Sequence, residues 1–115
     1  MENGLKAKIR VHLFTKDKCF GPGICQLLEA VEELGSLRKA AQSMDMAYSK
    51  AWKIIKLCEE NLGFSLLEST TGGKGGGGAV VTLKAKEMVT AYRKFCRELE
   101  EFAEGALEKN FKSMR

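Results

Sequence analysis

Basic side chains and glycines are the chemically distinctive residues of two stretches of this 115-residue sequence. Residues 36–56 hold five basic side chains against one acid, whereas residues 19–35 hold three glutamates and no base. The five are Arg38, Lys39, Lys50, Lys53 and Lys56. The second stretch, Ser69–Thr82, reads STTGGKGGGGAVVT and places Lys74 among six glycines. Cationic groups concentrated on one segment are typical of a surface that binds a polyanion.

The other reactive side chains indicate neither a metal site nor an active site. The four cysteines are scattered without a CxxC pair, and His12 is the sole histidine. A zinc site uses about four nitrogen or sulfur ligands at close spacing. Cys58 and Cys96 occupy apolar helical positions, where small buried thiols are common. Because no cluster combines an acid, a base and a nucleophile, we expect no metal, no cofactor and no enzymatic activity.

The periodicity of apolar residues predicts the elements that position these side chains. Residues 5–13 alternate apolar and polar, the pattern of a half-buried strand. The single proline, Pro22, marks the turn into a helix over residues 24–34, and Gly35 ends that helix.

Two further helices follow closely. Ser36 is a suitable N-cap for a short helix that extends to Met44, and small alanines on its buried side permit a close crossing. The next helix runs from Ala47 to Leu62 with its apolar residues at 100° spacing. Two helices joined by a tight turn, the second of them basic at its start, predict a helix-turn-helix.

The glycine-rich stretch has three candidate roles: a nucleotide-phosphate loop, a flexible linker or a hairpin tip. Its glycines match G-x-G-x-x-G, but a strand follows where a dinucleotide fold needs a helix, and Lys74 is not followed by the Ser or Thr of a Walker motif. A linker would be polar on both sides. Residues 64–69 and 79–83 instead read as strands, so the sequence predicts a wing directly after the helix-turn-helix.

Two segments resemble a known family. KAAQSMDMAYSKAWKII (Lys39–Ile55) and STTGGKGGGGAVVTL (Ser69–Leu83) are similar to the DNA-binding domain of ModE-type molybdate-responsive transcription regulators, which are relatives of the LysR-type winged helices. The most specific parts are M-x-Y-x-x-A-W and T-G-G-K-G-G-G-G-A. The resemblance extends from about Leu5 to Tyr92.

The resemblance implies a dimeric repressor or activator whose recognition helix enters the major groove while the wing contacts the flanking DNA backbone. The residues expected to contact DNA are Arg38, Lys39, Tyr48, Ser49, Lys50, Lys53, Lys56, Thr71, Gly73, Lys74, Gly75 and Gly76. The sequence departs from the family at Ser49, where a basic residue is usual and Lys50 takes that role. Family members continue into a molybdate-binding region, whereas this sequence stops at Arg115. We therefore expect it to lack that region and not to bind molybdate tightly on its own.

The C-terminal segment predicts a long helix with a second partner. From Lys84 to Phe111 there is no proline and one glycine, so a helix of roughly 40 Å is expected, with Thr82 as its cap. Apolar residues recur in steps of three and four, as in a coiled coil. We expect the first two turns to pack on their own domain and the rest to join two copies. The expected dimerisation residues are Met88, Tyr92, Phe95, Leu99 and Phe102.

Together these patterns predict an α+β, mainly α protein: a winged helix-turn-helix with a small antiparallel sheet (residues 1–83) and a C-terminal dimerisation helix (residues 84–115). The expected partners are double-stranded DNA and a second copy of the chain. No apolar run approaches the roughly 20 residues of a membrane helix, and no signal core is evident, so we expect a cytoplasmic protein. The alternative function is a winged-helix module that binds a protein and not DNA.

Overall fold

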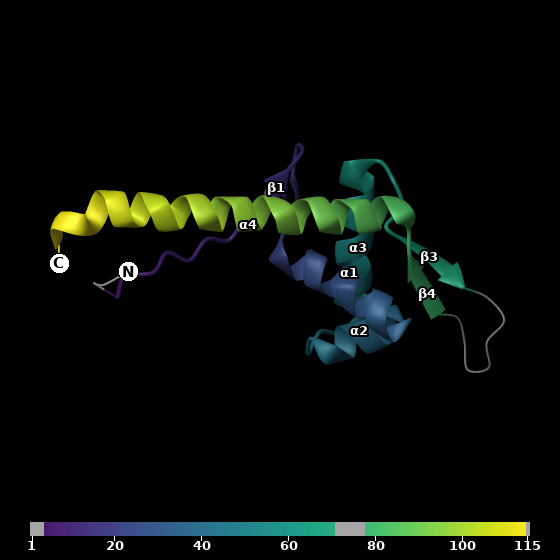
Figure 1. Cartoon of the computed structure of the whole chain (residues 1–115). Coiled ribbons are helices and arrows are strands. Elements are labelled where there is room, and N and C mark those ends of the chain that lie inside the picture. The colour runs from purple at the N-terminus through teal and green to yellow at the C-terminus, as the bar shows by residue number, and fades with distance from the viewer. Residues whose placement is uncertain (1–3, 71–77, 115) are drawn as a thin grey trace.

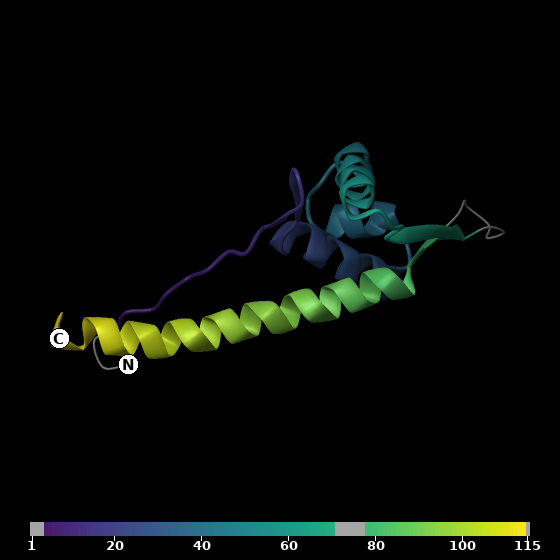
Figure 2. The same ribbon diagram turned by 90° about the horizontal axis from the view of Figure 1, so that it is seen from above.

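The computed structural model describes residues 4–70 and 78–114. The elements follow one another as β1 (Leu13–Phe14), β2 (Lys18–Phe20), α1 (Pro22–Leu34), α2 (Leu37–Ser43), α3 (Tyr48–Leu62), β3 (Leu67–Thr70), β4 (Gly78–Val81), α4 (Leu83–Phe111) and a short 3₁₀ turn, η1 (Lys112–Met114). Three helices and the β3–β4 hairpin gather at one end, while α4 begins among them and projects well beyond them (Figures 1 and 2).

Local sequence signals account for most helix ends. α1 starts at Pro22, whose fixed φ suits the first helical position, and it ends at Gly35, where φ is +73° and the amide donates to the Val31 carbonyl over 2.7 Å. The Ser36 hydroxyl caps α2 by accepting from the Lys39 amide at 3.2 Å. In the turn to α3, Asp45 has φ +52°, a conformation that Asp tolerates better than most residues.

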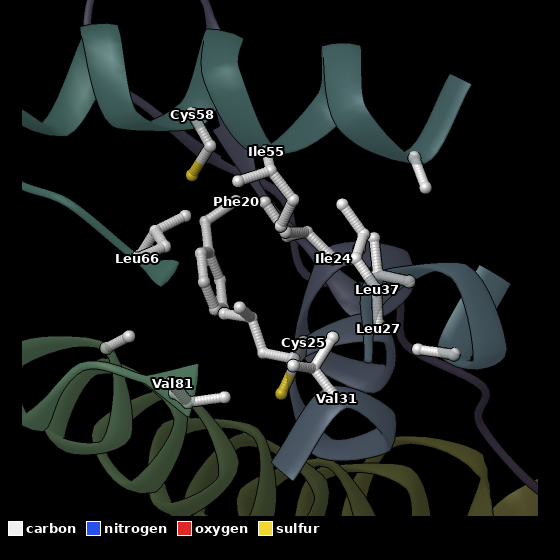
Figure 3. Close-up of a cluster of buried hydrophobic side chains, with 14 of the residues drawn as sticks. Phe20, Ile24, Cys25, Leu27, Val31, Leu37, Ile55, Cys58, Leu66 and Val81 are labelled. Atoms are coloured by element: carbon white, nitrogen blue, oxygen red, sulfur yellow. The ribbon is translucent and has the colours of Figure 1, made fainter. Parts of the chain in front are cut away.

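The core lies where α1, α2 and α3 meet (Figure 3). Ala40, Ala41 and Ala51 are essentially fully buried at the crossing of α2 with α3, as the alanine-rich sequence predicted. Burial raises the pKa of the Cys25 thiol to about 11 and that of Cys58 to about 12, so both remain protonated core residues at neutral pH.

The wing strands are antiparallel, with Leu67 opposite Val81 and Thr70 opposite Gly78. The predicted strands are right in kind and shifted in position. β3 begins at Leu67 rather than residue 64. β4 ends at Val81 rather than Leu83, because the Thr82 hydroxyl caps α4 by accepting from the Ala85 amide at 3.1 Å. The winged helix-turn-helix is confirmed.

The strand predicted over residues 5–13 is wrong for residues 5–12. Residues 5–12 form no strand with any other described residues. Residues 5–7 lie beside residues 100–108 of α4, and the segment then crosses to the rest of the domain (Figure 2). Leu5 and Ile9 remain exposed, so the alternation does not bury one face. Only Leu13–Phe14 forms a strand, β1, which pairs with β2 in a hairpin that the sequence had not indicated.

The first turns of α4 belong to the core. The Tyr92 ring lies edge-on to Phe20 at 5.1 Å between centroids, and its hydroxyl donates to the Val11 carbonyl at 2.7 Å. Arg93 donates from two nitrogens to the Glu29 carboxylate of α1 at 3.1 and 2.6 Å, and this hydrogen bonding raises the pKa of the arginine. α4 is therefore fixed against α1 before it leaves the domain.

Candidate nucleic-acid interface

The basic helices and the wing border a groove of about 550 Å³. Its walls are the first turns of α2, one side of α3 and the paired strands β3 and β4. The helical side chains that line it with polar or aromatic groups are Arg38, Lys39, Gln42, Tyr48, Trp52 and Lys56. This surface is thus mainly cationic and aromatic on its helical side.

A backbone hydrogen bond joins the wing to the corner between α1 and α2, and a second hydrogen bond closes the hairpin itself. The Ala79 amide donates to the Gly35 carbonyl at 3.1 Å, and the Gly78 amide donates to the Thr70 hydroxyl at 3.0 Å. A Cβ atom on Gly78 would lie 2.8 Å from the Gly35 oxygen and from the Thr70 hydroxyl oxygen. Only a residue without a side chain permits this approach, so Gly78 sets the distance between the wing and the helices.

Two aromatic rings on α3 hold cationic groups at the groove. The Arg38 guanidinium carbon lies 4.3 Å from the centre of the Tyr48 ring, and the Lys56 ammonium lies 5.6 Å from the centre of the Trp52 ring. Both distances are within the range of cation–π attraction. The two rings are four residues apart and therefore lie on one face of the helix. This face of α3 therefore holds one cation of its own, Lys56, and one from α2, Arg38, each against an aromatic ring.

Glu59 connects α3 to the base of the wing. One carboxylate oxygen pairs with the Lys56 ammonium at 3.3 Å, and the other accepts from the Leu66 and Leu67 amides at 2.7 and 3.3 Å. Because the carboxylate accepts from the Leu66 and Leu67 amides, it holds the start of β3 in a fixed position relative to α3. Lys56 is accordingly the one cation of the predicted set whose charge is paired within the described residues.

The structure brings some of the predicted DNA-binding residues together and separates others. Arg38, Lys39, Tyr48 and Lys56 line the groove. Ser49, Lys50 and Lys53 are exposed on α3 outside its lining. The predicted wing residues Thr71, Gly73, Lys74, Gly75 and Gly76 lie outside the described residues.

Sequence reasoning missed three groove residues. Trp52 is 47% exposed and forms part of the groove wall. Gln42 and Glu68 also line it, and Glu68 is the single acid in the lining formed by the described residues. The four-residue spacing from Tyr48 through Trp52 to Lys56 was a usable signal for Trp52, whereas nothing local marks the other two.

The predicted dimerisation residues divide along α4. Tyr92 is 3% exposed within the chain's own core, and Met88 is half-buried against it, so neither presents a free side chain to a partner. Leu99 is half-buried, Phe95 is exposed, and Phe102 is 76% exposed. The unpartnered apolar side chains of this set therefore begin at Phe95.

Two other kinds of feature are relevant to the described residues, a metal site and a membrane-spanning helix. Within residues 4–70 and 78–114, no three His, Cys, Asp or Glu side chains are grouped so that they could hold a metal ion. None of the helices described there is long and apolar enough to cross a membrane.

Comparison with known proteins gives a consistent family. The family of bacterial regulatory helix-turn-helix proteins of the lysR type matches residues 25–85. The molybdenum transport protein ModE of Herbaspirillum seropedicae is 36% identical over 76 residues, which is 66% of this chain and 28% of that protein. The DNA-binding transcriptional dual regulator ModE of Escherichia coli K12 is 33% identical over 89 residues, 76% of this chain and 34% of that protein. The chain thus spans about a third of the length of these relatives.

A solved structure supports the fold. The BenM DNA-binding domain, crystallised in complex with catB site 1 DNA, superimposes with a TM-score of 0.53 at 23% sequence identity. The match covers 79% of this chain and 93% of the other. At this identity the similarity establishes the shared winged-helix architecture.

Proposed function

Because this chain belongs to the lysR family of bacterial regulatory helix-turn-helix proteins, and because its relatives include ModE regulators, we propose that it binds double-stranded DNA and regulates transcription. The observation that carries this proposal is the cationic surface of α2 and α3 beside the wing. Four of its five basic side chains, Arg38, Lys39, Lys50 and Lys53, have no carboxylate partner among the described residues. Unpaired cations on one surface are suited to phosphates.

The geometry suits a helix in the major groove. B-DNA offers a groove about 12 Å wide, which admits an α-helix. With α3 there, Ser49, Lys50 and Lys53 on its exposed side would face base edges and nearby phosphates. Arg38 and Lys39 at the start of α2 would then face the sugar–phosphate backbone, and the wing would lie along the flanking DNA.

The alternative, a module that binds only proteins, is less well supported. A protein partner would need a dense acidic surface to match these cations, although the apolar Leu37, Ile55, Leu67 and Ala79 also line the groove. DNA supplies the required charge in a regular array.

The test is a titration of the chain with duplexes selected from a random pool, at several salt concentrations. We expect steeply salt-dependent binding. Lys50→Ala and Lys53→Ala should each either lower the salt slope by about one, if the lysine contacts phosphate, or cost roughly 1–3 kcal/mol and relax specificity, if it contacts a base. Lys109→Ala, on the distal part of α4, is the matched control. Unchanged binding by both α3 variants, with the fold intact, would remove this helix from the interface.

We further propose that the chain acts as a homodimer joined through the distal half of α4. Residues 1–83 then form the DNA-binding part, and residues 84–115 form the dimerising helix, whose first turns pack on the core of the DNA-binding part. A two-fold dimer places two recognition helices on a near-palindromic site. DNA as the partner also implies a cytoplasmic location.

Molybdate is not a proposed ligand of this chain alone, although the relatives' names refer to molybdenum. Oxyanion sites need several convergent donors held in place. The groove offers Arg38 and Lys39 at an open surface, and Glu68 opposes an anion there. Submicromolar binding of molybdate by calorimetry would contradict this.

A further inference from the structure

We infer that Tyr48 is a positioning residue that acts on DNA through Arg38. The ring holds the guanidinium at the groove, so that the arginine side chain is already ordered when it meets a phosphate. The inference rests on the proposed DNA-binding function and assigns Tyr48 a role other than base reading. It depends on the relation between the first turn of α2 and the first turn of α3.

The two residues meet because the helix-turn-helix brings both helix starts to the same groove. Arg38 is the second residue of α2 and Tyr48 is the first of α3, and both line the groove beside the wing. The guanidinium carbon lies 4.3 Å from the ring centre. Tyr48 is 39% exposed, so the residue keeps contact with solvent at the groove.

The ring is the main constraint on Arg38 that the structure shows. No carboxylate of the described residues lies within ion-pair distance of Arg38. Arg38 therefore keeps its full charge for an anion, and its guanidinium edge carries the donors that match a phosphate. A long side chain loses rotamer freedom when it binds, and a side chain already held over a ring loses less of it.

Two neighbouring cations show what distinguishes Arg38. Lys39 lines the same groove with no aromatic ring over its ammonium in the described structure. Lys56 lies over the Trp52 ring, but it also pairs with Glu59 at 3.3 Å, which neutralises part of its charge. Among the described cations that line this groove, Arg38 alone combines ring contact with an uncompensated charge, so Tyr48 has a specific group to position.

The experiment measures affinity for a selected duplex by fluorescence anisotropy in a double-mutant cycle. Tyr48→Leu should weaken binding about two- to five-fold, the range of a cation–π contact at an exposed site. Tyr48→Phe keeps the ring and should bind within about two-fold of the unmodified chain. In an Arg38→Ala background Tyr48→Leu should have no further effect, whereas in a Lys39→Ala background it should keep its full effect.

Several outcomes would overturn the inference. An equal loss from Tyr48→Leu with and without Arg38 would mean that the ring contacts DNA itself or acts through the fold. A loss in Tyr48→Phe equal to that in Tyr48→Leu would assign the effect to the hydroxyl. Circular dichroism checks folding, and Tyr48→Met replaces the leucine variant if that one unfolds. If the unmodified chain binds no duplex, the proposed function fails as well; if it binds and the cycle shows no coupling, only the role of Tyr48 fails.

Discussion

At the scale of single residues, Glu59 joins α3 to the base of the wing. It is half-buried in the last turns of α3, and its carboxylate accepts from two backbone amides at the start of β3 while it also pairs with Lys56. Backbone amides left without an acceptor in a half-buried place are costly, and bonds to a charged acceptor are stronger than neutral ones.

We expect Glu59→Ala to lower the free energy of unfolding by roughly 1–3 kcal/mol, because two amides lose their acceptor. Glu60→Ala, the next residue and exposed on the same helix, should change it by less than about 0.5 kcal/mol. Urea unfolding followed by circular dichroism measures both. Equal effects of the two substitutions would show that the contact between α3 and β3 adds little stability.

Tyr92 gives the fold a dependence on alkaline pH. Burial, together with a hydrogen bond to Cys96, raises the pKa of the Tyr92 phenol from 10 to about 12. The folded chain holds this proton more tightly than the unfolded chain does. The resulting stability is therefore complete below pH 10 and is lost as the pH rises toward 12.

The raised pKa values of Cys25 and Cys58 lower the free energy of unfolding as the pH rises above about 9. Between about pH 10 and 12 we expect Tyr92 to add a decline of up to about 1.4 kcal/mol per pH unit. Tyr92→Phe should be less stable at pH 8, because it loses the bond to the Val11 carbonyl, and should decline less steeply above pH 10. Urea unfolding of both proteins at pH 8 and at several pH values above 10 tests this. Parallel pH profiles for the two proteins would rule Tyr92 out as the source.

At the scale of elements, the position of the wing depends on one close contact between backbones. β4 approaches the corner between α1 and α2 so closely that the Gly35 carbonyl accepts from Ala79. Gly78 permits this approach, and its own amide is bonded within the hairpin. The wing and the two helices therefore form one rigid surface only while position 78 lacks a side chain.

We expect Gly78→Ala to weaken DNA binding evenly across sequences, because a Cβ atom 2.8 Å from the Gly35 oxygen forces the wing away from the helices. Gly105→Ala, at an exposed and unobstructed position in α4, should leave binding unchanged and add up to about 1 kcal/mol of stability. Anisotropy titrations against specific and scrambled duplexes provide the measurement. Unaltered affinity in Gly78→Ala would show that the wing position does not matter for binding.

At the scale of the whole molecule, α4 extends far beyond the domain that it leaves. Its 29 residues span roughly 44 Å, and the molecule measures 62 Å along its longest axis against 28 and 22 Å across. Phe95 and Phe102 are exposed along the projecting part. Exposed aromatic residues repeated along one helix face are typical of a surface that another chain covers.

We expect the unmodified chain to sediment as a dimer, and Leu99→Lys combined with Phe102→Lys to sediment as a monomer with most of its operator affinity lost. Two lysines would place charges in the apolar interface, and a monomer engages one half-site at a time. The control variant, Glu101→Lys combined with Glu104→Lys, also introduces two lysines, but on the opposite side of α4. It should remain dimeric. A dimeric Leu99/Phe102 variant would place the interface elsewhere.

The sequence alone determined the helices, their ends and the wing. These depend on neighbours within a few positions: a 3.6-residue apolar period, Pro22 at a helix start, Ser36 as a cap and glycines at positive φ after α1 and α3. It also identified the cations of α2 and α3, because charge is a property of composition. The extended segment of residues 5–12 was misassigned because alternation describes a strand only when a neighbouring strand is available to pair with it.

Only the tertiary structure decided which of these residues meet. Tyr48 faces Arg38, Glu59 holds the amides of β3, and Gly78 abuts Gly35, although each pair is separated by seven or more positions in the chain. Tyr92 likewise turned inward to Phe20 rather than toward a second chain. Local periodicity says which side of a helix is apolar, but which partner covers that side depends on how distant elements pack, and that is set by the shape of the whole core.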